Sequence, residues 1–140
     1  MDNNRALNYL ALGKKGRLIE LGEEPVGAVA RAVKARLVVV ASDASDHTWR
    51  RAKSFVAGTE QQCIRVPFTK EELGFVIGRT SLAIAAITDA SLALALAKAL
   101  PEPEKHKAAI EVLEEKSRKM QQRAKEAKAH KRNVRMGKKK

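Results

Sequence analysis

A run of seven residues, "RLVVVAS" at positions 36–42, limits the folds open to this chain more than any other feature of the sequence. A strand with one wet face alternates apolar and polar residues, whereas a strand covered on both faces reads as a continuous apolar run. Positions 37–41 are apolar without a break. We therefore expect a central strand with helices packed against both faces of its sheet.

Helix-like and strand-like stretches alternate along the chain before and after this run. Further strands are expected at 17–21, 62–68 and 82–88, and helices at 4–15, 22–34, 46–58, 69–77 and 89–100. This order predicts an α/β fold, namely a three-layer α/β/α sandwich around a small four-stranded sheet. The 140 residues suit one domain, which we place at 1–100, followed by a tail at 101–140.

Short polar residues mark the expected helix starts. Ser45 or Asp46 can cap the helix at 46–58, and Asp89 can cap the helix at 89–100. Thr69 and Glu72 have the spacing of a capping box, in which each side chain satisfies the other residue's backbone N–H group. These signals predict where three of the helices begin.

The helix expected at 22–34 begins with a glycine and carries Pro25 in its first turn, where a missing N–H group costs nothing. Val26, Val29, Ala30 and Val33 follow at the i, i+3, i+4 and i+7 positions. This spacing predicts one buried face that includes Val33.

The net charge of +12 is concentrated near the C-terminus. Residues 101–140 hold 14 Lys and Arg against 6 Glu, whereas residues 1–100 hold 14 against 10 acidic residues. Such a balance favours a polyanionic partner, with nucleic acid before an anionic membrane surface. A solvated, solubilising tail is the alternative.

The tail changes in composition after Pro101. Residues 104–132 place Ile110, Leu113 and Met120 among charged residues, which predicts a helix that forms when docked. We expect residues 133–140 to lack regular structure. The tail is therefore predicted to be basic and partly helical or disordered.

Chemistry-bearing residues are few and scattered, so we expect no enzyme, no metal and no cofactor. His47 is most simply a solvent-facing residue at a helix start, and Cys63 most simply fills a buried strand position. One cysteine cannot form an intrachain disulfide. We also expect no membrane span and no signal peptide, which indicates a cytoplasmic protein.

Three short stretches have the composition of phosphate-binding loops. They are "GKKGRL" with Lys14, Lys15 and Arg17, "SDAS" at 42–45, and "GRTS" at 78–81. Small residues let an RNA backbone approach closely, and Arg or Lys adds charge-assisted hydrogen bonds. With one Trp and one Tyr, recognition of RNA shape and phosphate suits the chain better than base stacking. We expect these loops to share one edge of the sheet.

The stretches "GKKGRLIELGEEPV", "KARLVVVASDAS" and "ELGFVIGRTSLAIAAITD" resemble those of the kink-turn-binding ribosomal protein superfamily, the L-seven-Ae/L-thirty-e fold. The resemblance covers about residues 7–97 and is strongest to small bacterial relatives encoded near translation-factor genes. It implies an α/β/α sandwich that binds bent, internally looped RNA. Taken together, the three loops and the resemblance give candidate RNA-binding positions at Lys14, Lys15, Arg17, Gly22, Glu23, Glu24, Lys34, Asp43, Ser45, Gly78, Arg79, Thr80 and Ser81.

The superfamily's best-known RNA contact motif is altered in this chain. Its seven positions fall on residues 22–28, where only Gly22 matches. Glu24 takes the place of Asn, Pro25 of Glu, Gly27 of Thr and Ala28 of Lys. The lost lysine removes a cation, and Glu24 adds an anion that repels phosphate.

Two functions follow from these observations. The first is a ribosome-associated, monomeric protein that recognises structured, kink-turn-like RNA of the ribosomal class and associates with the ribosome or a translation factor. The second is a protein-interaction or scaffold module of the same fold, whose tail docks on a partner through Ile110 and Leu113.

Overall fold

The computed structural model describes residues 2–137 and contains a four-stranded sheet and its helices. The elements in chain order are α1 (Asp2–Lys15), β1 (Ile19–Leu21), α2 (Glu23–Arg31), β2 (Leu37–Val40), α3 (Asp46–Val56), β3 (Gln62–Arg65), α4 (Lys70–Val76), β4 (Ile84–Ile87), α5 (Ala90–Lys98), the 3-10 helix η1 (Pro103–His106) and α6 (Lys107–Gly137). The expected alternation of helices and strands is confirmed.

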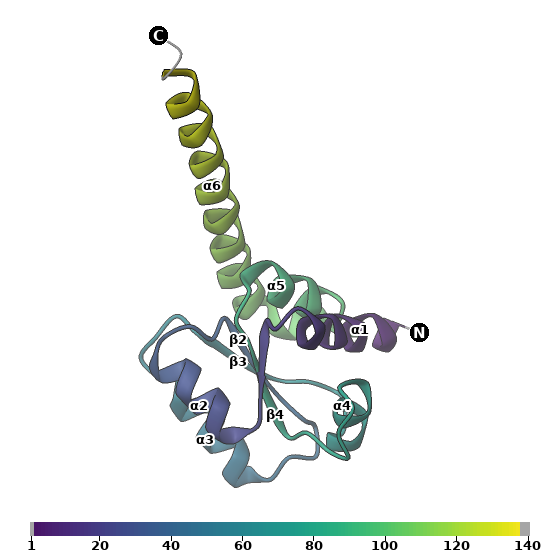
Figure 1. The fold of residues 1–140 in the computed structure, drawn as a ribbon. Coiled ribbons are helices and arrows are strands. Elements are labelled where there is room, and N and C mark those ends of the chain that lie inside the picture. Colours follow the sequence, from purple (N-terminus) through teal and green to yellow (C-terminus); the bar gives the residue numbers. More distant parts are fainter. Residues whose placement is uncertain (1, 138–140) are drawn as a thin grey trace.

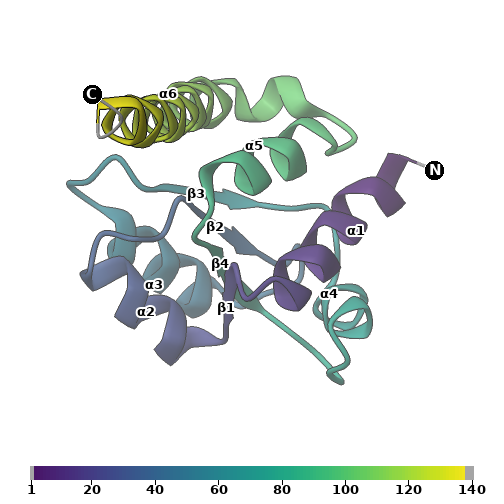
Figure 2. The ribbon, with the colours of Figure 1, turned by 45° about the horizontal axis from the view of Figure 1, so that its top comes forward.

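The strands lie in the order β1-β4-β2-β3. β2 and β3 are parallel, whereas β4 runs antiparallel to both of its neighbours, β1 and β2. Helices α2 and α3 cover one face of the sheet, and α1 and α5 cover the other (Figures 1 and 2). The predicted three-layer α/β/α sandwich is therefore confirmed, with α6 packed outside α5.

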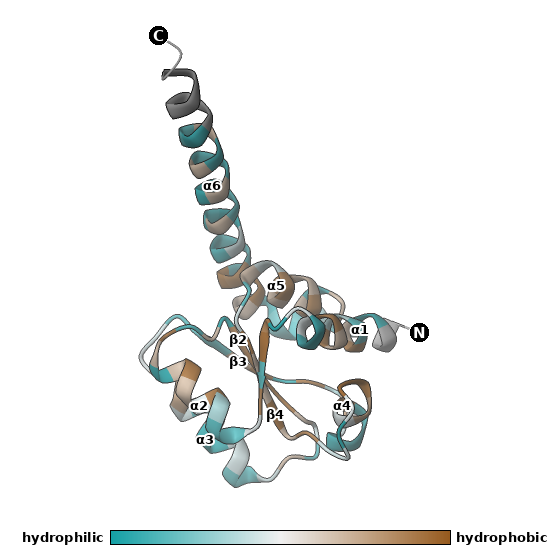
Figure 3. Ribbon diagram, in the orientation of Figure 1, coloured by the Kyte–Doolittle hydropathy of each residue, from teal (hydrophilic) through white to brown (hydrophobic). Residues whose placement is uncertain are grey.

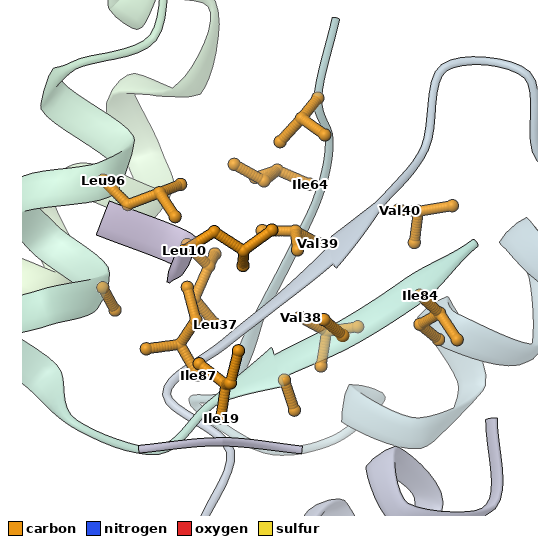
Figure 4. Packing of buried hydrophobic residues seen from close by; sticks show 14 of the residues in the cluster. Leu10, Ile19, Leu37, Val38, Val39, Val40, Ile64, Ile84, Ile87 and Leu96 are labelled. Carbon is orange, nitrogen blue, oxygen red and sulfur yellow. The ribbon is translucent and has the colours of Figure 1, made fainter. Parts of the chain in front are cut away.

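The core is built almost wholly from aliphatic side chains. Every residue of β2 and of β4 is buried, so the continuous apolar run does form a strand covered on both faces. Leu10 of α1 and Leu96 of α5 close over this sheet (Figure 4). The hydropathy colouring shows the same division, with apolar strands inside and a largely hydrophilic α6 (Figure 3).

The predicted caps are confirmed in three helices. The Ser45 side chain accepts a hydrogen bond from the Thr48 backbone, and Asp89 accepts one from Leu92. Thr69 and Glu72 form the reciprocal capping box. Each cap satisfies an N–H group that the first turn of a helix leaves without a partner.

The end of α2 differs from the prediction. The helix stops at Arg31, and Val33 has a left-handed backbone with a φ of 55° and a side chain 54% exposed. The amides of Val33 and Lys34 donate to the carbonyls of Ala30 and Val29, the paired bonds of a Schellman turn. Val33 is therefore the residue after the helix, not part of its buried face.

The start of α6 belongs to the packed domain. Leu113 and Ala109 are buried in the same core cluster as the sheet, and the hydroxyls of Ser117 and Ser91 lie 2.9 Å apart. The expectation that Leu113 docks on a partner is therefore wrong, because α5 and its neighbours already cover it.

The remainder of α6 is a long exposed helix. Side chains from Arg118 to Lys131 are exposed, and the helix continues through Gly137, where we expected no regular structure. Its Ala, Lys, Arg, Glu and Gln residues are good helix formers, which accounts for its length. Residues 138–140 lie outside the described part of the chain. No helix in the described residues is long and apolar enough to cross a membrane.

Candidate nucleic-acid interface

Four turns of the chain lie together at one end of the strands of the sheet. At this end, which we call the α2 edge, β1, β2 and β3 end and β4 begins. The Gly22 amide donates to the Ile84 carbonyl with an N···O distance of 3.0 Å, and the Ala41 amide donates to Ala83 at 2.9 Å. These bonds bring the start of α2 and the loop after β2 to the start of β4.

The start of α2 is open at this edge. Gly22 is the N-cap residue, with φ 98° and ψ 162°, and no side chain caps the helix. This backbone conformation is essentially restricted to glycine, which explains why a glycine stands at position 22. The uncapped first turn leaves the N–H groups of Glu23 and Glu24 without an intrahelical partner, at the positive end of the helix dipole.

The two glutamates after Gly22 differ in their surroundings. Glu23 forms an ion pair with Arg51 of α3, with 2.5 Å between Nε and Oε1. Glu24 is exposed and has no ion-pair partner among the described residues. Of these two glutamates, only Glu24 therefore presents an unbalanced negative charge to a ligand at this edge.

Two predicted RNA-binding residues make structural bonds instead. Asp43 accepts a hydrogen bond from the Lys70 amide at 2.8 Å, which ties the loop after β2 to the start of α4. Ser45 caps α3 through the Thr48 amide at 3.1 Å. Both residues lie at the α2 edge, but their side-chain oxygens accept backbone hydrogen bonds that fix the loop after β2.

The loop between α4 and β4 is held closely against α4. A Cβ atom added at Gly74 would lie 2.7 Å from the Ser81 Cα atom and 2.8 Å from the Arg79 carbonyl oxygen. The Arg79 amide donates to the Gly74 carbonyl, and the Leu82 amide donates to the Lys70 carbonyl. The side chains of Arg79, Thr80 and Ser81 are exposed, so this loop presents a cation and two hydroxyl groups on a fixed backbone.

Phe75 is an exposed residue that the sequence pattern did not single out. Its side chain is 84% exposed on α4, next to the buried Gly74 and three residues before Gly78. An exposed phenylalanine beside a candidate interface can pack against a base or an apolar partner. The pattern of α4 contained the signal, because Leu73 and Ile77 form its buried face and leave Phe75 outside.

The first predicted loop is divided between the two edges of the sheet. The Lys14 ammonium donates to the Ile77 carbonyl and lies beside Gly78. Arg17 instead lies before the start of β1, whereas Gly22 follows the end of that strand. The carbonyl of the adjacent Leu18 accepts a hydrogen bond from the Thr88 amide, which follows β4. A strand rises about 3.3 Å per residue, so Arg17 and Gly22 lie roughly 15 Å apart.

The opposite edge, which we call the α6 edge, carries the remaining predicted cations. Lys15 lies beside Leu18 and Ser91, and Lys34 lies in the turn between α2 and β2. The expectation that all three loops share one edge is therefore wrong for Lys15 and Arg17. Lys34, predicted as a separate RNA contact, also lies away from Gly22. The reason is topological, because each of these three residues precedes a strand that begins at the α6 edge.

Cys63 lies on the edge strand β3, where it is half-buried and not fully enclosed as expected. Burial raises the pKa of its thiol to about 12, although nearby Lys53 and Arg65 act in the opposite direction. The thiolate is the reactive form of cysteine, so this residue is a poor nucleophile at neutral pH.

No protein-family model matches the sequence, and no curated protein matches it. Among solved structures, the chain is similar to a protein of unknown function from Bacillus halodurans. The two are 25% identical with a TM-score of 0.63, over 68% of this chain and 95% of the other. It is also similar to the Giardia lamblia 15.5kD RNA binding protein, at 19% identity and a TM-score of 0.60, over 77% of this chain and 89% of the other. These likenesses show a shared fold.

Proposed function

We propose that this chain binds structured RNA through the α2 edge. The observation that carries the proposal is the bond from the uncapped start of α2 to the start of β4, the strand that follows the exposed loop at Arg79–Ser81. Backbone N–H groups and a cation on a fixed surface suit phosphate groups and the shape of a bent RNA. The fold is shared with an RNA-binding protein of Giardia lamblia, which supports the same partner class.

Charge supports this partner class and also indicates how recognition is altered. The net charge of +12 attracts a polyanion, and the pairing of Glu23 with Arg51 balances one of the two glutamate charges that follow Gly22. Glu24 still opposes a phosphate at this edge. We therefore propose that the preferred RNA is kink-turn-like but meets fewer side-chain contacts than the superfamily motif provides.

Ribosomal RNA is the target class that we propose first, on the resemblance of the sequence. Sedimentation of the full chain with ribosomal subunits at low and moderate salt tests this choice. Co-sedimentation that persists at moderate salt supports it. Release at moderate salt, together with retained binding to an isolated kink-turn RNA, would point to another RNA.

A protein partner is the second candidate function. Phe75 is 84% exposed, and Glu24 disfavours RNA at the same edge. An aromatic side chain that projects from a short helix is typical of an anchor in a protein interface. In this alternative α4 is the docking surface, because Leu113 is buried and Ile110 already packs against the core.

A paired titration tests the RNA proposal. The full chain is titrated at moderate salt with an RNA that contains a kink-turn and with a duplex matched in length and composition. We expect tighter binding to the kink-turn RNA, and a loss of that preference in Arg79→Gln. Equal affinity for both RNAs, unchanged in Arg79→Gln, would contradict recognition through the α2 edge.

A further inference from the structure

A basic hollow lies at the α6 edge, on the far side of the sheet from the proposed RNA contact. It has a volume of about 320 Å³ and is lined by Arg36, Thr88, Ala90, Lys116, Lys119, Met120 and Arg123. Four of these seven residues are cations, and none is acidic. The cations come from two parts of the chain, since Arg36 precedes β2 and the other three belong to α6.

A larger hollow adjoins the first one. It has a volume of about 550 Å³, and Arg36 and Lys116 line both. Val33 and Val112 supply apolar wall, and Gln61 and Thr59 supply polar groups. Together the two hollows form a groove between the α6 edge of the sheet and α6, which we call the α6 groove.

The positive charge of the α6 groove is only partly balanced. Glu60 lies 3.3 Å from the Lys116 ammonium, whose side chain is only 24% exposed. Glu115 lies 3.9 Å from Lys119 along the same helix. No acidic partner of Arg36 or Arg123 is found among the described side chains. The groove therefore has a net positive charge with two guanidinium groups available to a ligand.

Helix geometry explains why the three α6 cations face one way. At about 100° per residue, Lys116, Lys119 and Arg123 fall within about 60° of one another around the helix. The buried Leu113 fixes the rotation of α6, so its cations flank the contact with the domain. Figure 1 shows α6 leaving the sandwich on the side opposite the loop between α4 and β4.

We propose that the α6 groove binds the phosphate backbone of an RNA strand. Guanidinium and ammonium groups spaced along a helix match successive phosphates, and the planar guanidinium forms paired hydrogen bonds to phosphate oxygens. The walls at Val33 and Met120 are exposed by 54% and 37%, which leaves apolar surface for a ribose or base. A membrane surface fits less well, because α6 has no Trp or Phe to insert among lipids.

This inference rests on the proposed function and adds a second contact to it. The α2 edge and the α6 groove lie at opposite ends of the sheet strands. One RNA segment at each edge would be held at a distance set by the sheet. The chain would then join two segments of a folded RNA, and its affinity for a plain duplex would come chiefly from the α6 groove.

A charge-matched comparison in the full chain tests the inference. One variant carries Lys119→Gln and Arg123→Gln in the groove. The control carries Lys125→Gln and Lys128→Gln, which remove equal charge about 140–200° round the helix from Arg123. Both are titrated with a plain RNA duplex by fluorescence anisotropy over a series of salt concentrations, and circular dichroism checks that helix content is unchanged.

We expect the groove variant to lose affinity about tenfold and the control at most about threefold. The slope of log K against log salt should fall by about 2 in the groove variant, because about one counterion is released per phosphate contact. Arg36→Gln, on the globular part, should lose affinity about fivefold, as expected for one hydrogen bond of ordinary net strength.

Equal losses in the groove variant and the control would overturn the inference while leaving RNA binding intact. No binding of the unmodified chain to either the duplex or a kink-turn RNA would instead overturn the proposed function. The same variants are titrated with vesicles of mixed phosphatidylcholine and phosphatidylserine. A groove-dependent loss on vesicles, without one on RNA, would also overturn the inference and indicate a membrane ligand.

Discussion

Gly74 of α4 and Ser81 of the following loop approach so closely that only a hydrogen fits between them. A Cβ atom at position 74 would lie 2.7 Å from the Ser81 Cα atom, and the obstructing atoms are backbone atoms that cannot rotate away. The shape of the loop that presents Arg79 at the α2 edge therefore depends on a residue with no side chain.

Gly74→Ala should displace this loop. Insertion of a methyl group into a tightly packed site costs about 1–3 kcal/mol, so we expect the free energy of unfolding to fall by that amount. Denaturant unfolding measures the change, and a kink-turn RNA titration should show weaker binding of the folded variant. Gly16→Ala is the control, because a Cβ there would meet no atom closer than 3.5 Å. Equal stability of the two variants would contradict the close contact.

Val33→Gly should stabilise the chain. A β-branched residue with positive φ costs about 1–2 kcal/mol, and Val33 is exposed enough to lose little buried surface. The greater freedom of glycine when unfolded offsets about half of this gain, so we expect a net rise of about 0.5–1 kcal/mol in the free energy of unfolding. The neighbouring Ala32 has an ordinary φ of −81°, so Ala32→Gly should lower the free energy of unfolding instead. Thermal and denaturant unfolding measure the change in the free energy of unfolding of each variant. A decrease in both variants would contradict the strain at Val33.

Two truncations should separate the packed and the projecting parts of α6. A chain that ends at Met120 keeps Ala109 and Leu113, so its free energy of unfolding should change by less than about 1 kcal/mol. A chain that ends at Leu100 loses both residues and should be destabilised by at least about 3 kcal/mol, as for the loss of a buried leucine. Comparable stability of the two shortened chains would show that α6 does not pack on α5.

Glu24→Gln should strengthen RNA binding at the α2 edge. Removal of an exposed charge that repels phosphate should raise affinity for a kink-turn RNA by about threefold to tenfold, with the larger effect at low salt. Glu111→Gln removes the same charge from an exposed position on α6 and serves as the control. An equal gain in both variants would mean that only net charge matters, and no gain in either would place the RNA elsewhere.

Much of the fold could be predicted because its signals are local. The caps at Ser45, Thr69 and Asp89 depend on residues within three positions, and the apolar run of β2 needs no knowledge of distant contacts. The end of α2 depends on a distant residue instead. The Gln61 side chain donates to the Ala30 carbonyl and accepts from the Ala35 amide, which secures the turn around Val33.

The candidate site was predicted less completely, because composition does not tell at which end of a strand a loop lies. Gly22 is bonded to the start of β4, which the loop carrying Arg79 precedes, but β1 separates Arg17 from Gly22. The α6 groove was also outside the reach of the sequence pattern. In the sequence, the Lys and Arg residues that line it are typical of a solvated tail. Only the packing of Leu113 against the domain places Lys116 beside Arg36.

The most direct test of RNA binding is a backbone amide NMR titration of the full chain with a kink-turn RNA. We predict saturable shifts at Gly22–Glu24 and Gly78–Ser81, together with a second set at Arg36 and along Lys116–Arg123. The helix face of α3 should stay unperturbed. Saturable shifts confined to α3 and β3, or no shifts at salt low enough for any basic protein to bind RNA, would contradict the account.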